Sequence, residues 1–127
     1  MISSGNGTHP PGQTHDPETF FREAMAAREV GDLRAAARLL NDVLRVLPRA
    51  KPALHARAHL AFQRAEADAL AHFDRALAVD PGNADLHLGK ARALDLIGDH
   101  RGARIVAEQI AAQTPGFIGA LTFLSSL

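Results

Sequence analysis

Small and apolar residues recur at intervals of three and four along most of the chain, the spacing that places them on one face of an α-helix. Ala36, Leu40 and Val43 show this spacing in the first of three such segments. Each segment ends at a proline, and together they cover residues 36–48, 69–81 and 103–115. Proline ends a helix because its ring disfavours helical torsions at the residue before it. The pattern predicts an all-α fold.

The segments repeat at a regular distance. Their prolines are 33 and 34 residues apart, at Pro48, Pro81 and Pro115. The dipeptides Gly31-Asp32 and Gly98-Asp99 are 67 residues apart, which equals the two intervals combined. Glycine ends a helix at positive φ and aspartate caps the next helix, so each dipeptide predicts a tight turn. The repeating unit is therefore helix, turn, helix and proline.

This pattern resembles the tetratricopeptide repeat family. In its first helix the family has a bulky residue followed four positions later by a small one, here Phe20 with Ala24, Leu54 with Ala58 and His87 with Ala91. Its second-helix triplet is matched by Ala36, Leu40 and Val43, by Ala69, Phe73 and Ala76, and by Ala103, Ala107 and Ile110. The resemblance implies a right-handed superhelix of stacked α-α hairpins with about seven helices. Its repeats would span residues 17–50, 51–83 and 84–117, and residues 118–127 would form a partial repeat or capping helix.

The middle repeat departs from this pattern. It has Arg64-Ala65-Glu66 where the others have Gly-Asp, and it is one residue shorter, which leaves its turn geometry open. His87 is also a poor substitute for the large apolar residue of the family pattern.

Residues 1–16 are rich in Gly, Pro, Ser and Thr and contain no Lys or Arg and no apolar run. Such a segment buries too little surface to offset its ordering entropy, so we expect a flexible tail. A secretory signal would need both missing features. Elsewhere charged residues and histidines interrupt every apolar stretch, so we expect no membrane span and a cytoplasmic location.

The last residues carry an apolar stripe at i+3 spacing, formed by Ile118, Leu121, Leu124 and Leu127. It resembles the first helix of a fourth repeat whose second helix is missing. Repeat arrays normally end in a polar cap. Two explanations stay open: the chain is cut from a longer protein, which we favour, or the stripe joins two protomers in a homodimer.

Charge and composition exclude several functions. The chain has 14 basic and 14 acidic residues and no cysteine. Without surplus positive charge, neither nucleic acid nor an anionic membrane is an expected partner. The lack of cysteine excludes disulfides, thiolate metal sites and cysteine nucleophiles. No catalytic triad, carboxylate pair or phosphate loop is indicated by local spacing, so we predict no enzyme, no catalytic residue and no cofactor.

His55 and His59 are four residues apart and share one helix face. Such a pair can hold a metal ion, but neither an acidic residue nor a third histidine stands at matching helical spacing. We therefore interpret the pair as two partly exposed groove histidines and predict no metal site. Metal binding is the less favoured alternative.

The resemblance implies that first helices line a concave groove, with nine inward-facing residues: Phe21, Met25, Arg28, His55, His59, Phe62, Leu88, Arg92 and Asp95. This mixed apolar and charged surface suits an extended or helical peptide, so we predict a non-catalytic scaffold that binds a protein or peptide. Alternatively, Phe21, Met25 and Phe62 pack against the tail or a neighbouring helix. Family members that clamp a terminal carboxylate use Lys, Asn and Arg in the groove, and this region lacks that set.

A second functional hypothesis places the chain in a larger enzyme. Similar repeats often precede sulfotransferase, oxygenase or glycosyltransferase domains in bacterial enzymes. The chain would then be the amino-terminal part of such an enzyme and would serve recruitment or dimerisation.

Overall fold

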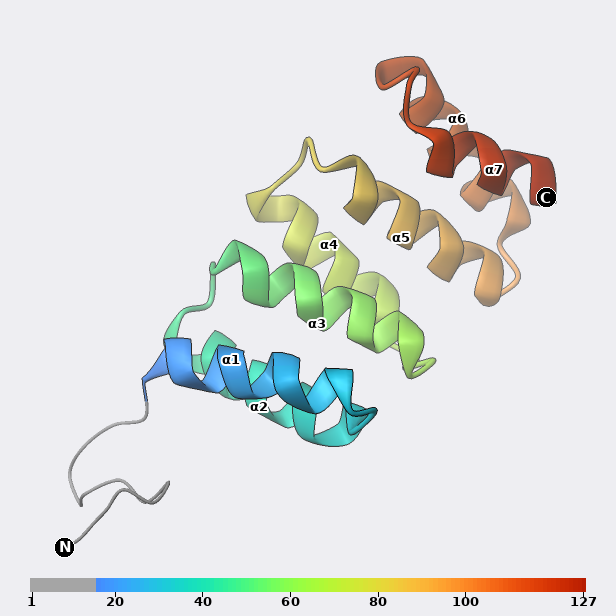
Figure 1. The fold of residues 1–127 in the computed structure, drawn as a ribbon. Helices are drawn as coiled ribbons and strands as arrows, with labels where there is room; N and C mark the ends of the chain where they lie inside the picture. Colours follow the sequence, from blue (N-terminus) through green and yellow to red (C-terminus); the bar gives the residue numbers. More distant parts are fainter. Residues whose placement is uncertain (1–15) are drawn as a thin grey trace, which may run out of the picture. The chain divides into compact units, whose positions relative to one another are not determined.

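The computed structural model describes residues 16–127, so all but the last residue of the predicted tail lies outside the described part. In that part the chain forms seven helices and no strand: α1 (Pro17–Glu29), α2 (Leu33–Val46), α3 (Lys51–Gln63), α4 (Ala69–Val79), α5 (Ala84–Leu96), α6 (His100–Gln113) and α7 (Ile118–Ser126). They pack as sequential hairpins, α1 with α2, α3 with α4 and α5 with α6 (Figure 1). The predicted all-α fold is confirmed for these residues. None of their helices is long and apolar enough to cross a membrane.

The chain divides into two compact units. The first unit, up to Pro48, holds the α1–α2 hairpin, in which Ala24, Ala36 and Leu40 are fully buried. The second unit runs from Arg49 to Leu127 and holds α3 to α7.

Consecutive helices of the second unit contact each other, and α3 also contacts α5. The largest fully buried side chains of this unit are Leu60, Phe73 and Leu86, one from each of α3, α4 and α5. Every helix here thus contributes to a core through small residues and a few large ones, as the repeat period predicts.

The two Gly-Asp turns have the predicted geometry. Gly31 and Gly98 adopt φ values of +85° and +95°, a region that glycine enters without steric cost. The Asp32 carboxylate accepts the Ala35 N–H at 3.1 Å, and Asp99 accepts the Gly102 N–H at 2.9 Å. Both aspartates therefore cap the helix that follows.

The middle turn reaches the same backbone geometry without glycine. Ala65 has φ +53° and donates its N–H to the Phe62 carbonyl at 3.0 Å, while the Glu66 N–H bonds to the Ala61 carbonyl at 2.9 Å. The Gly31 and Gly98 turns make the equivalent bonds. What differs is the second helix. No side chain caps α4 at its N-cap residue Asp68, and α4 begins only at Ala69, giving it 11 residues where α2 and α6 each have 14.

The apolar stripe of α7 does not form one exposed face. Ile118 and Leu121 are 73% and 48% exposed, whereas Leu124 and Leu127 pack against a buried cluster shared by α5, α6 and α7. Residues three apart differ by about 60° around a helix, so four residues at this spacing sweep half of its circumference. The predicted stripe therefore consists of two exposed residues and two partly buried ones.

Candidate functional site

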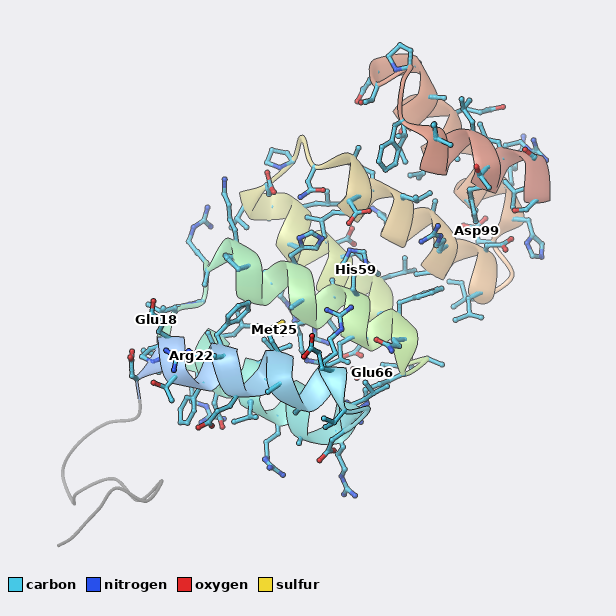
Figure 2. All side chains as sticks on the ribbon, viewed as in Figure 1. Glu18, Arg22, Met25, His59, Glu66 and Asp99 are labelled. Carbon is cyan, nitrogen blue, oxygen red and sulfur yellow. The ribbon has the colours of Figure 1, made fainter. Side chains whose placement is uncertain are left out.

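The predicted groove residues lie on the first helix of each hairpin. Phe21, Met25 and Arg28 lie on α1 of the first unit, and each is half-buried. The other six belong to the second unit, three on α3 and three on α5. Figure 2 shows His59 on the side of α3 that faces α5.

Leu88 is not available to a partner. It is 3% exposed and belongs to the buried cluster of α5, α6 and α7. A Cβ added at Gly119 of α7 would lie 2.9 Å from its Cδ2 atom, so α7 approaches Leu88 closely. Because α7 covers α5 as the first helix of a next repeat would, the predicted groove position is here a core position.

The remaining α5 residues stay accessible. Arg92 is exposed, and half-buried Asp95 pairs with the His100 imidazole. A wide depression of about 550 Å³ lies next to this pair, lined by Asp95, His100, Arg101, Arg104, Ser126 and Leu127. It is open to solvent, and its arginines are exposed.

In the structure, the Asp85 carboxylate lies close to both histidines of the pair. The rings of His55 and His59 are 4.7 Å apart between centroids. Their Nε2 atoms lie 3.3 Å and 3.5 Å from Oδ2 of Asp85, a residue in the first turn of α5. The position of Asp85 is fixed locally, because the neighbouring Asn83 caps α5 by accepting the Leu86 N–H.

The His59 ring packs against a buried aromatic side chain. Its ring meets Phe73 edge to face, with centroids 5.2 Å apart, and Phe73 is fully buried. A Cβ at Gly89 would lie 2.3 Å from Cε1 of Phe73, so α5 approaches α4 closely only because residue 89 has no side chain. The contact of α4 with α5 thus fixes the position of Phe73, on which the His59 ring packs.

A second polar cluster surrounds Glu66 in the middle turn (Figure 2). Arg57 is 6% exposed, and its guanidinium donates to both Glu66 carboxylate oxygens, at 2.9 Å and 3.2 Å. Arg64 donates to Glu66 Oε2 at 2.8 Å. Two arginines therefore neutralise one half-buried carboxylate, which is a structural arrangement that joins α3 to its turn.

His72 lies at the edge of the same cluster. Its Nδ1 atom is 3.1 Å from Arg75 Nη1, which can only donate, so the proton of the neutral ring is on Nε2. That nitrogen lies 3.4 Å from Asp68 Oδ2 and 3.8 Å from Glu66 Oε1. Burial, and after it the charge of Arg57, lowers the pKa of His72 below the ordinary value of 6.5. Both effects favour the neutral imidazole.

Of the predicted site residues, the structure brings His55 and His59 together with Asp85, which the sequence interpretation missed. His55 and Asp85 are 30 residues apart, close to one repeat length. The repeat period could have revealed the contact of His55 with Asp85, because equivalent first helices lie side by side in a repeat array. Local helical spacing alone could not reveal it.

Comparison with known proteins supports the repeat interpretation. Residues 63–122 match the sequence model of a tetratricopeptide repeat family. No curated protein sequence matches the chain.

Solved structures with this fold include two of MamA and one of an O-GlcNAc transferase. A crystal structure of MamA is 23% identical, with a TM-score of 0.77, over 83% of this chain and 62% of that one. MamA from Desulfovibrio magneticus RS-1 is 19% identical, also with a TM-score of 0.77, over 83% and 60% of the two chains. A mutant O-GlcNAc transferase from Thermobaculum terrenum is 24% identical, with a TM-score of 0.68, over 83% of this chain and 21% of that one.

The chain therefore spans about three fifths of the MamA structures, and at these identities the likeness concerns the fold alone. That fold agrees with the hairpins described above and with the sequence match over α4 to α6. Residues 63–122 thus match the tetratricopeptide repeat family, and the described part of the chain shares the fold of the MamA structures.

Proposed function

We propose that the chain is a non-catalytic module that binds a peptide or protein segment through the exposed face of its first helices. In the second unit this face consists of His55, His59 and Phe62 on α3 and Arg92 and Asp95 on α5. The observation that carries the proposal is Phe62, a half-buried aromatic residue one turn from His59 and two turns from His55. An aromatic anchor beside a charged side chain is typical of protein interfaces.

The residues on α1 extend the proposal to the first unit. Phe21 and Met25 offer apolar contact there, and Arg28 offers a charge. Leu88 is left out because it is buried.

A panel of random 12-residue peptides displayed on phage tests this function. The variant Phe62→Ala/Arg92→Glu should bind the selected peptides at least about tenfold more weakly, because it removes an anchor and reverses a charge. The matched control is Ile105→Ala/Arg38→Glu, which changes exposed residues of the second helices α6 and α2 and should bind as the parent does. Equal binding by the parent and the first variant would refute the proposed face.

A second function is favoured by the likeness to the O-GlcNAc transferase, of which this chain would cover only 21%. In that case the repeats serve recruitment or dimerisation for a larger bacterial enzyme. The gene sequence after the Leu127 codon decides the question. A transferase-like reading frame there would support this function, and a stop codon at that point would remove it.

A further inference from the structure

We propose that His55, His59 and Asp85 bind a divalent transition-metal ion, with Zn²⁺ as its reference ion. The proposal goes beyond peptide binding and does not depend on it. It also revises the sequence interpretation, which found two ligands and therefore predicted no metal. The third ligand comes from α5, where Asp85 lies within reach of both imidazoles.

The distances fit a tetrahedral ion. Zinc binds imidazole nitrogen and carboxylate oxygen at about 2.0–2.2 Å, which places neighbouring ligand atoms of a tetrahedron about 3.3–3.6 Å apart. The two Nε2 atoms lie 3.3 Å and 3.5 Å from Asp85 Oδ2. One ligand atom from each of the three residues lies within 4.8 Å of the others. Small side-chain rotations would therefore be enough to complete the coordination.

The ligand types favour a particular class of ion. Two imidazoles and one carboxylate suit zinc, copper or nickel, whereas magnesium and calcium prefer oxygen ligands. Three protein ligands leave one tetrahedral position for water or another donor. The pair at i and i+4 on α3 fixes two ligands on one helix face, and the contact of α3 with α5 brings the third.

The supporting residues hold the ligands in place before an ion arrives. The His59 ring is held against buried Phe73, and Asp85 belongs to a capped first helical turn. Such support reduces the ordering cost of binding, because the ligands lose little freedom on coordination. Asp85 also brings a negative charge to a site whose other ligands bind metals as neutral groups.

The other group of potential ligands in the described part lacks these features. Glu66, Asp68 and His72 also lie close together, but Arg57 and Arg64 already occupy both oxygens of Glu66. Two adjacent guanidinium charges oppose a cation. We therefore assign the metal to the α3–α5 cluster alone.

The test uses the full chain without an affinity tag, in a His9→Ala/His15→Ala background that removes the two histidines of the predicted tail. Calorimetric titration with Zn²⁺ should show one ion per chain. Titration with Co²⁺ should give the intense visible absorption of a four-coordinate site. In this background His55→Gln and Asp85→Asn should each weaken binding at least about tenfold, the effect that even outer-shell substitutions can reach.

The matched control is His100→Gln, which removes a histidine that also pairs with an aspartate, Asp95, but has no second imidazole beside it in the described structure. This variant should bind both ions as the background protein does. Excess Zn²⁺ should also raise the melting temperature of the background protein and of the control but not of Asp85→Asn. His55 and Asp85 are partly exposed, so their variants should fold, and circular dichroism verifies this.

Unchanged affinity in His55→Gln and Asp85→Asn would overturn the proposal. So would an equal loss of affinity in His100→Gln, or a background protein that binds neither ion. In each of those cases Asp85 serves only as a hydrogen-bond partner of His55 and as a negative charge near His59. Peptide binding can persist under any of these results, so failure of the metal site and failure of the proposed function are distinguishable.

Discussion

Ala65 occupies a backbone position that glycine fills in the two equivalent turns. Its φ of +53° brings Cβ close to the backbone, a cost that Gly31 and Gly98 avoid. The turn keeps this geometry because its two backbone hydrogen bonds and the pairing of Glu66 with Arg57 hold it there. A single residue type is therefore less decisive for this turn than the helices that it joins.

Ala65→Gly should stabilise the protein by ~0.5–1 kcal/mol, because it relieves the left-handed alanine. Urea unfolding measures the effect. The control Ala71→Gly lies at an exposed position of α4 and should cost about 1 kcal/mol. Destabilisation by Ala65→Gly would show that the turn carries no strain.

Gly89→Ala should destabilise the protein by roughly 1–3 kcal/mol, because the new methyl group would overlap the Phe73 ring. Gly82→Ala is the matched control, since a Cβ there meets no atom within 4 Å. Its free energy of unfolding should stay within about 0.5 kcal/mol of the parent's. Equal effects of the two variants would contradict the close approach of α5 to α4.

His72 should make folding stability depend on pH. Its pKa is lowered in the folded state, so the unfolded chain binds the proton more readily. The stabilisation is complete above the unfolded value of 6.5 and is lost as the pH falls from there through the lowered folded value. Between about pH 7.5 and 5, the parent should lose more stability than His72→Gln, as measured by urea unfolding. Parallel pH profiles of the two proteins would rule out this role.

At the level of helices and turns, some features follow from residues close together in the sequence, and others depend on a neighbouring repeat. The Gly-Asp turns and their caps could be predicted because their hydrogen bonds join residues at most a few positions apart. Asp85 could not be found in that way, because its partners lie on α3, one repeat earlier. Leu88 was misassigned for a related reason, since the helix that buries it, α7, lies one repeat later.

The ion pair of Arg57 with Glu66 joins α3 to the turn before α4. Glu66→Gln should cost roughly 1–3 kcal/mol, because it removes the charge that faces a nearly buried guanidinium. The control Asp74→Asn breaks the more exposed pair with Lys90 and should cost ~0–1 kcal/mol. Thermal unfolding compares them, and a Glu66→Gln variant as stable as the parent would contradict a structural role for this pair.

At the scale of the whole molecule, the hairpins form two compact units, and the second ends at α7. Ala120 and Phe123 of α7 are buried, whereas Ile118 and Leu121 are exposed. The all-α repeat fold could thus be predicted from the period. The exposed part of α7 could not, because it depends on which side of that helix α5 and α6 cover.

Ile118 and Leu121 are the residues through which a homodimer would form, because they are the exposed part of the predicted stripe. If such a homodimer forms, Ile118→Asp/Leu121→Asp should shift the sedimentation coefficient from that of a dimer to that of a monomer. Ile105→Asp, another exposed apolar position, should leave it unchanged. A parent protein that sediments as a monomer would argue against self-association through α7.

We propose that this repeat array contacts other proteins through its first helices. Hydrogen–deuterium exchange with the tightest peptide from the phage panel tests it most directly, because protection reports the bound surface helix by helix. Binding through the first helices should slow exchange in α3 and α5, with no change in α4 and α6. Protection confined to α4 and α6 would contradict it.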